Sequence, residues 1–268
     1  GIRVFYYISP KFWAWREGRV KKVKRYVDRL YIIFPFEKEF YRRHDFPAIF
    51  LGNPLADHIE GWRSKAPARQ EIRDSLGLDA RPVIALLAGS RLQEVSRILP
   101  LMASVAPSFP GCQFVVAAMD HLPHTLYRRC IDEYPVKIIT GMTYEILALS
   151  SAALVTSGTA TLEAALFNVP QVVCYSTSPM TYHLAKWFIK VRFISLVNLI
   201  MEREVVRELI QGDLNHERLQ KELADILPEG CRHETLRKDY EELQTVLGGS
   251  GASVRVAKDM VANLDTQA

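Results

Sequence analysis

The chain has 268 residues, of which 49% are hydrophobic and 24% charged, and its formal net charge is +4. This length fits one large domain or two small ones, and the composition excludes disordered and fibrous proteins. No apolar run approaches the about 20 residues that span a bilayer, so an integral membrane protein is not predicted. The four cysteines are far apart and form no CxxC pair, which indicates reduced thiols and no zinc site.

The beginning of the chain alternates predicted strands and helices. Residues 4–9, 31–36 and 48–54 are apolar and favour strands, and the helices predicted between them cover residues 21–30 and 37–45. The first strand needs neighbours for its apolar side chains and its backbone groups. We therefore expect that an upstream part of the protein is missing from this chain.

The same alternation resumes near residue 69. Short apolar runs alternating with amphipathic helices are typical of a parallel sheet that is covered on both faces. The predicted elements are helix 70–78, strand 83–90, helix 92–105, strand 113–119, helix 124–134, strand 136–140, helix 143–151, strand 152–158 and strand 171–176. After them the chain is predicted to be helical, in residues 181–190, 202–211, 216–227, 233–247 and 253–264.

Asn53-Pro54 interrupts the first block, and a GlyGlySerGly run precedes the last helix. We therefore predict an α/β protein in three parts. Residues 1–53 are the end of a first parallel-sheet domain, and residues 54–247 are a second one with a helical extension. Residues 248–268 form a last helix that crosses back or is exchanged in a dimer.

A small-residue turn follows the predicted strand 83–90. Gly89 allows close approach of the backbone, Ser90 and Arg91 follow it, and free amides at the start of the next helix suit an anion such as phosphate. Arg91 would add a charge-assisted contact. The alternative is a plain turn in which Arg91 pairs with Glu94 on the surface.

A second turn of the same design follows the strand 152–158. Its residues are Ser157, Gly158 and Thr159, and the helix after them carries Thr161 and Glu163. Ligands of open α/β sheets bind beyond the carboxyl ends of strands, so the two turns are predicted to face one ligand. The threonines would donate to phosphate, and Glu163 would accept from ribose hydroxyls. The alternative is that the turn simply caps its helix.

Several catalytic motifs are absent. The sequence contains no GxxxxGK[ST], GxGxxG, GxSxG or HExxH, which weakens the predictions of an ATPase, a dehydrogenase, a serine hydrolase and a zinc protease. The seven histidines show no metal-ligand spacing, so no metal or cofactor is predicted.

The segment from Lys11 to Arg29 is basic and aromatic. It carries eight Lys or Arg against two acids, a net charge of +6, interleaved with side chains such as Trp13 and Trp15. Such a patch suits an anionic lipid, an acidic substrate or nucleic acid, although no nucleic-acid module accompanies it. The alternative is a charged helix face that is simply exposed to solvent. A second such stretch, Tyr182–Phe193, suits a membrane interface, a core helix or an oligomer contact.

Six motifs in this order and spacing resemble the lipid-A-disaccharide synthase family, and the resemblance covers nearly the whole chain. They are SPKFWAWREGRVKKVKR, FPFEKEFY, LGNPLAD, LLAGSRLQEVSRILP, SGTATLEAAL and ISLVNLIMEREVVRELIQ. The resemblance implies an inverting glycosyltransferase of the GT-B architecture, in which two Rossmann-like domains face each other. This chain would hold the donor domain and the end of the acceptor domain.

The resemblance also implies the reaction. Diacylglucosamine is transferred from UDP-2,3-diacylglucosamine to 2,3-diacylglucosamine 1-phosphate, which gives the lipid A disaccharide 1-phosphate and UDP, without a metal. The expected partners are this donor, the acylated acceptor and the anionic inner-membrane surface, with the enzyme peripheral on the cytoplasmic face. Some family members exchange their last helices in a dimer, so a homodimer is left open.

Residue roles follow from the same resemblance. Arg91 and Asn198 are expected to stabilise the diphosphate leaving group, and the general base is expected outside this chain. The expected UDP-binding residues are Gly89, Ser90, Arg91, Gly141, Met142, Ser157, Gly158, Thr159, Ala160, Thr161, Glu163 and Asn198. The expected membrane or lipid contacts are Trp13, Trp15, Arg16, Arg19, Trp187 and Lys190.

Two positions depart from the family pattern: Asn53 replaces a histidine common in relatives, and Val197 replaces a proline. Two alternatives stay open at this point. One is another GT-B-like UDP-sugar enzyme, such as a MurG-like transferase or a UDP-sugar epimerase. The other is a non-catalytic module that binds nucleotides or anionic lipids.

Overall fold

The computed structural model describes residues 2–15, 17–178 and 192–264. The chain divides into two compact units. The described residues of the first unit are 2–15, 17–65, 192 and 242–264, and those of the second are 66–178 and 193–241. The sequence places a boundary at Asn53, whereas the chain leaves the first unit after Lys65, because helix α4 packs on the last helix, α14.

The first unit is built on a three-stranded parallel sheet with the order β1-β2-β3. Its core forms where Val20 and Val23 of α2 and Tyr41 of α3 pack with Leu30 and Ile32 of β2. The elements are β1 (Phe5–Tyr7), α1 (Phe12–Trp15), η1 (Glu17–Arg19), α2 (Val20–Tyr26), β2 (Arg29–Ile32), α3 (Glu37–Arg42), β3 (Ala48–Phe50), α4 (Pro54–Arg63) and α14 (Ala252–Leu264).

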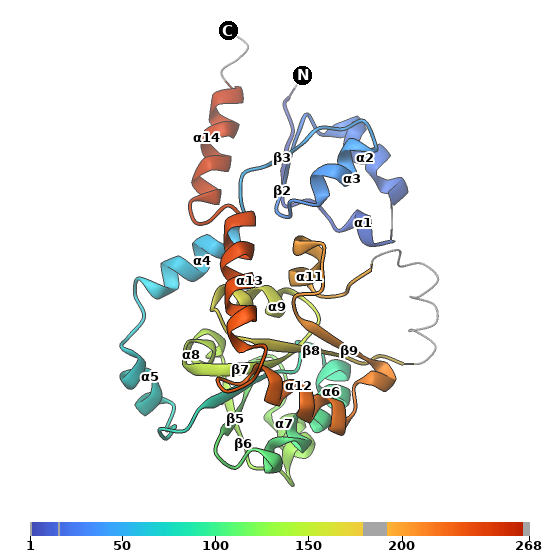
Figure 1. Cartoon of the computed structure of the whole chain (residues 1–268). Coiled ribbons are helices and arrows are strands. Elements are labelled where there is room, and N and C mark those ends of the chain that lie inside the picture. The colour runs from blue at the N-terminus through green and yellow to red at the C-terminus, as the bar shows by residue number, and fades with distance from the viewer. Residues whose placement is uncertain (1, 16, 179–191, 265–268) are drawn as a thin grey trace. The chain divides into compact units, whose positions relative to one another are not determined.

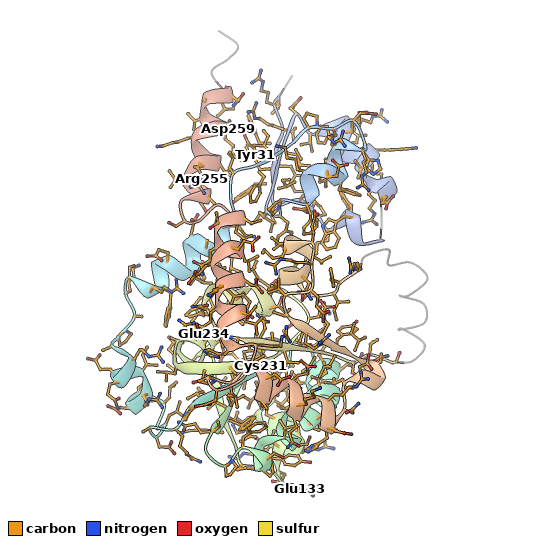
Figure 2. The ribbon with its side chains drawn as sticks, viewed as in Figure 1. Tyr31, Glu133, Cys231, Glu234, Arg255 and Asp259 are labelled. Atoms are coloured by element: carbon orange, nitrogen blue, oxygen red, sulfur yellow. The ribbon has the colours of Figure 1, made fainter. Side chains whose placement is uncertain are left out.

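Helix α14 is held in the first unit by hydrogen bonds at its N-terminus and in its middle. Asp57 of α4 accepts hydrogen bonds from the backbone amides of Gly251, Ala252 and Ser253, and so caps the helix N-terminus. Further along, the Asp259 carboxylate accepts from the Arg29 guanidinium at 2.9 Å and from the Tyr31 hydroxyl at 2.7 Å (Figure 2). The helix therefore crosses back onto strands and helices of its own chain.

Asn53 is the N-cap of α4. Its Oδ1 accepts from the Leu55 amide at 2.9 Å, and its Nδ2 donates to the Ile33 carbonyl at 2.9 Å. The side chain is 2% exposed, so this residue ties the helix to the loop after β2.

The second unit is built on a six-stranded parallel sheet with the order β6-β5-β4-β7-β8-β9 (Figure 1). Its strands are β4 (Val83–Leu87), β5 (Gln113–Ala118), β6 (Val136–Thr140), β7 (Ser150–Thr156), β8 (Gln171–Tyr175) and β9 (Arg207–Ile210). Its other elements are α5 (Arg69–Ser75), α6 (Leu92–Ser104), η2 (Ala106–Ser108), α7 (His124–Ile131), α8 (Thr143–Leu149), α9 (Thr159–Leu166), α11 (Leu196–Met201), η3 (Gln211–Asp213), α12 (His216–Ile226) and α13 (His233–Val246), of which α13 continues into the first unit.

The strand order reverses at the middle of this sheet. From β4 the chain moves outward through β5 and β6, then returns to the other side of β4 and moves outward through β7, β8 and β9. Strands β4 and β7 are paired directly, with Ala85 opposite Ala153. All of these pairings are parallel, so the carboxyl ends of the strands share one edge.

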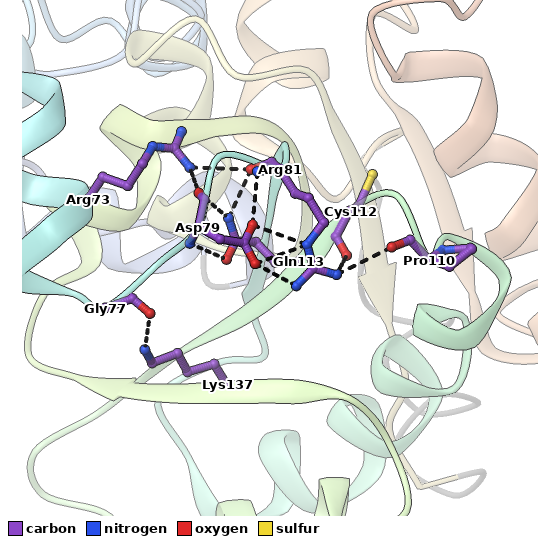
Figure 3. A network of polar contacts seen from close by, with 8 residues as sticks. All are labelled: Arg73, Gly77, Asp79, Arg81, Pro110, Cys112, Gln113 and Lys137. Atoms are coloured by element: carbon purple, nitrogen blue, oxygen red, sulfur yellow. Dashed lines mark hydrogen bonds and ion pairs between the residues drawn. The ribbon is translucent and has the colours of Figure 1, made fainter.

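The opposite, amino edge of the sheet is closed by a polar network (Figure 3). The Gln113 amide donates to the carbonyls of Asp79 and Arg81 at 2.9 Å, and the Arg81 guanidinium pairs with the Asp79 carboxylate at 2.7 Å. Lys137 donates to the Gly77 carbonyl at 2.7 Å. These side chains supply hydrogen-bond partners for the backbone carbonyls of the loop before β4. We therefore assign these residues a structural role in folding.

Two predicted helices are wrong in part. The basic helix predicted for residues 21–30 ends at Tyr26, and β2 begins at Arg29, because the apolar residues that follow pair with β1 and β3. The helix predicted for residues 202–211 contains instead strand β9, which pairs with β8. The predicted parallel sheets and the predicted helices between residues 216 and 264 are confirmed, whereas the predicted helix 181–190 lies outside the described residues.

Within the described part of the chain, no helix is both long and apolar enough to cross a membrane.

Candidate nucleotide-binding site

The GSR turn, formed by Gly89, Ser90 and Arg91, lies between the carboxyl end of β4 and the start of α6. Gly89 has a φ of +106°, a conformation that favours glycine, and a Cβ there would lie 2.5 Å from Glu94 Oε2. Ser90 and Arg91 are exposed, and the Arg91 side chain is 82% exposed. The turn is therefore open to solvent and keeps its backbone accessible at the glycine.

A carboxylate occupies the amides of this turn. Glu94 Oε2 accepts from the backbone amides of Ser90 at 3.2 Å and Arg91 at 3.3 Å, and Glu94 Oε1 accepts from the Arg91 guanidinium at 3.0 Å. The surface pairing of Arg91 with Glu94, considered from the sequence, is thus present. The same three donors also demonstrate that the turn can hold an anionic oxygen pair.

The SGT turn, formed by Ser157, Gly158 and Thr159, connects the carboxyl end of β7 to the start of α9. Gly158 has a φ of +145°, and a Cβ there would meet no atom within 4 Å. Thr159 is exposed, whereas Ser157, Gly158 and Ala160 are half-buried. Since β7 is hydrogen-bonded to β4, the SGT and GSR turns follow adjacent strands at the point where the strand order reverses.

Two hydroxyl groups, one in the SGT turn and one in the first turn of α9, donate hydrogen bonds to backbone carbonyls of the protein. Thr161 is fully buried and donates to the Gly158 carbonyl at 2.8 Å. Ser157 donates to the Ile194 carbonyl at 2.8 Å. Thr159 therefore has the more accessible hydroxyl for an anion, and Thr161 shapes the turn.

Glu163 lies one turn into α9 and is half-buried. Its Oε1 accepts from the Tyr144 hydroxyl of α8 at 3.4 Å. Burial, and then this carboxylate, raise the pKa of Tyr144, so the hydroxyl stays a donor. Gly141 and Met142, expected near the uracil, are exposed between β6 and α8, and Gly141 has a φ of +72°.

Asn198 lies in a different environment from the turns. It is fully buried in α11, and its Oδ1 accepts from the amides of Val205 and Val206 at 2.8 and 2.9 Å. Its Nδ2 donates to the Val206 carbonyl at 2.8 Å and to Glu208 Oε1 at 2.9 Å. A direct contact with a diphosphate would require some of these bonds to break.

Glu208 is a residue of this region that the sequence analysis missed. It stands on β9, and its carboxylate accepts from the backbone amides of Ile194 and Ser195 as well as from Asn198. No alternating pattern in the sequence indicated a strand there, because the apolar residues Val206 and Leu209 are three positions apart.

The expected lipid contacts lie in the first unit or outside the described side chains. Trp13 is half-buried in α1 and Arg19 is exposed in η1. Arg16, Trp187, Lys190 and the side chain of Trp15 lie outside what the structure describes, as does most of the stretch 182–193. Among the described residues, no group of three His, Cys, Asp or Glu could hold a metal ion.

The fold is of the GT-B type, and the second unit contributes a parallel sheet whose strand order reverses at its middle. Similar solved structures include the UDP-GlcNAc 2-epimerase of Neisseria meningitidis bound to UDP-GlcNAc, with a TM-score of 0.62 and 14% identity over 90% of this chain and 63% of that chain. A putative UDP-N-acetylglucosamine 2-epimerase of Listeria monocytogenes gives a TM-score of 0.63 at 15% identity, over 92% of this chain and 63% of that one. At these identities the likeness concerns the fold alone.

The family is given by the sequence comparisons. The model of the lipid-A-disaccharide synthetase family matches residues 1–260. The lipid-A-disaccharide synthase of Trichlorobacter lovleyi is 37% identical over 96% of this chain and 68% of the relative, and that of Anaeromyxobacter sp. (strain K) is 38% identical over 97% and 69%. The chain belongs to the lipid-A-disaccharide synthetase family, the glycosyltransferases of lipid A biosynthesis.

The chain spans about two thirds of the length of these curated relatives and 63% of the two solved structures. The resemblance read from the six motifs is confirmed, and with it the glycosyltransferase class. The family match favours this class over the alternatives of an epimerase and a MurG-like transferase.

Proposed function

We propose that the carboxyl edge of the six-stranded sheet binds the UDP part of a UDP-2,3-diacylglucosamine donor, whose sugar is transferred to 2,3-diacylglucosamine 1-phosphate. The observation that carries this proposal is the position of the GSR and SGT turns on the directly paired strands β4 and β7. Two helix N-termini and Arg91 then converge on one anion. Family membership supports the sugar and the acceptor.

The ligands of similar solved structures support a nucleotide sugar as the ligand. The Neisseria enzyme was determined with UDP-GlcNAc, and a further similar structure, HepE of Anabaena, was determined with UDP and glucose, at a TM-score of 0.57 and 12% identity over 97% of this chain and 72% of that chain. The proposal carries the uridine diphosphate of these structures over to the present chain.

The chemistry of the turn fits the leaving group of an inverting transfer. When an acceptor hydroxyl attacks the anomeric carbon, negative charge develops on the diphosphate oxygens. The amides of Ser90 and Arg91 and the Arg91 guanidinium would stabilise that charge, as they now stabilise the Glu94 carboxylate. A diphosphate must therefore displace Glu94 from these donors.

We also infer that the chain works at an anionic membrane surface. Lys21, Lys22, Lys24 and Arg25 are exposed on α2, whereas Val20 and Val23 of the same helix are buried in the core. One face of the helix is therefore strongly basic and available to lipid phosphates. The proposed substrates carry acyl chains, which also favour a reaction at a membrane surface. A homodimer stays a prediction.

Replacement of Arg91 tests the assignment of the diphosphate. We expect Arg91→Ala to weaken UDP binding by about 1.5 to 3 kcal/mol, or about ten- to a hundredfold, because it removes a charge-assisted contact and leaves the Glu94 charge uncompensated. Isothermal titration calorimetry measures this change. Arg97→Ala, which removes an exposed arginine further along, inside α6, is the matched control and should leave the affinity unchanged. Equal affinities of Arg91→Ala and the unmodified chain would contradict the assignment.

A further inference from the structure

The Glu208 carboxylate collects three hydrogen bonds from one short segment. Its Oε2 accepts from the Ile194 amide at 3.0 Å, and its Oε1 accepts from the Ser195 amide at 2.9 Å and from Asn198 Nδ2 at 2.9 Å. Hydrogen bonds to an ionised carboxylate are about twice as strong as those between neutral groups. Glu208 is thus a charged anchor for residues 194–198.

The anchored segment touches the SGT turn. Ile194 presents its amide to Glu208, and its carbonyl accepts from the Ser157 hydroxyl at 2.8 Å. Ser157 is the first residue after β7 and directly precedes Gly158, the residue with the glycine-type backbone conformation. A continuous path of hydrogen bonds therefore runs from Glu208 on β9 through Ile194 to the start of α9.

Asn198 makes the anchor rigid. It is fully buried, it donates to the same Glu208 oxygen, and it accepts from the amides of Val205 and Val206 just before β9. Ser195, also fully buried, accepts from the Asn198 amide at 3.2 Å. The segment consequently has little freedom to shift relative to β9 while the Glu208 bonds are intact.

We propose that Glu208 is a positioning residue for the donor site, which fixes the SGT turn through residues 194–195 and Ser157. This inference rests on the proposed function, because it deepens the role of the same turn. Glu208 does not contact the nucleotide in this account. It determines where Gly158 and Thr159 lie, and the shape of the turn determines the affinity for the diphosphate.

The test combines hydrogen exchange with calorimetry on the full chain. The variants are Glu208→Gln, Ser157→Ala and their combination. The matched control is Glu204→Gln, because Glu204 lies four residues before Glu208 and forms an ion pair with Arg207 at the surface. Amide exchange is measured by mass spectrometry over residues 157–161, and the affinity for UDP is measured by titration. Melting temperatures establish that each variant is folded at the assay temperature.

We expect Glu208→Gln to raise exchange in residues 157–161 and to weaken UDP binding about tenfold, as the loss of one charge-assisted network would. Ser157→Ala should act in the same direction, and the double variant should lose no more than the larger single loss, because both changes cut one path. A merely structural role for Glu208 would not produce this coupling with Ser157.

Two results would overturn the proposal: exchange in residues 157–161 that is the same in Glu208→Gln and in the unmodified chain, or losses of affinity that multiply in the double variant. If Glu208→Gln does not fold, Glu208→Asp keeps the charge with a shorter side chain and is expected to show the same coupling. Failure of the unmodified chain to bind UDP, with the exchange effect present, would refute the nucleotide assignment and leave the positioning of the turn supported.

Discussion

Glu37 is a fully buried acid at the start of α3. Its Oε2 accepts from the amides of Phe34 at 3.1 Å and Ile33 at 3.3 Å, while its Oε1 and the indole nitrogen of Trp13 are buried without a hydrogen-bond partner. Burial raises the pKa of Glu37 from 4.5 to about 7, and the hydrogen bonds from the Phe34 and Ile33 amides only partly oppose this shift. The protonated form is therefore the one that suits the folded first unit.

This raised pKa predicts a pH dependence of stability. The folded state holds the proton more tightly than the unfolded chain, so the contribution of Glu37 is fully present below about pH 4.5 and is lost as the pH rises through 7. The shift corresponds to about 3 kcal/mol in the free energy of unfolding. We expect Glu37→Gln to remove this part of the pH dependence, because the amide cannot ionise.

Urea unfolding at pH 5 and pH 8 measures this effect. Tryptophan fluorescence follows the first unit, because Trp13, Trp15 and Trp62 belong to it. The control is Glu39→Gln, since Glu39 is exposed and its pKa is lowered to about 2 by Arg42 and Arg43, outside this range. An unchanged difference between the two pH values in Glu37→Gln would show that the buried carboxyl is not responsible.

At the scale of the element, helix α2 carries the prediction on membranes. Lys21→Gln/Lys22→Gln should reduce binding to anionic vesicles at low salt about tenfold or more, because each surface Lys contributes about 1 kcal/mol to binding of anionic lipid. Arg128→Gln/Arg129→Gln removes the same charge from exposed positions of α7 and should have little effect. Vesicle flotation measures the bound fraction. Equal losses in both variants would reduce the effect to net charge and contradict a role for α2.

The elements differ in how well the sequence predicts them. The strands β4, β5 and β7 are continuous apolar runs between helices, so the pattern alone identified them. Residues 202–211 look helical by composition, yet Arg207–Ile210 form β9 because the edge of β8 is free to pair with them. Such a pairing is non-local, and the sequence pattern does not contain it.

For the site as well, local features were predictable from the sequence and non-local contacts were not. Both turns were found because small residues after a buried strand are a local signal, and their location on adjacent strands follows only from the strand order. The sequence predicted the contact between the Glu94 carboxylate and the Arg91 side chain as an alternative, but not the hydrogen bonds that Glu94 accepts from the backbone amides of Ser90 and Arg91. The contacts of Glu208 with Ile194 and Ser195 depend on where β9 lies, so they were missed.

At the scale of the whole molecule, each unit has its own sheet and its own core. The first unit closes on itself through α14, whose Asp259 accepts from Arg29 and Tyr31 over more than 220 positions of sequence. The second unit contains both turns of the proposed site. The donor site is therefore proposed within one compact unit, which makes nucleotide binding measurable on this chain.

The central claim is that the turns after β4 and β7 form a site for UDP. Isothermal titration calorimetry of the intact chain with UDP, beside ADP and inorganic phosphate, tests it most directly. The account predicts saturable binding of UDP that is clearly tighter than binding of ADP or phosphate, because the diphosphate is held by both turns and the base by the region after β6. A folded chain that gives no heat with UDP, or that binds ADP equally well, would contradict it.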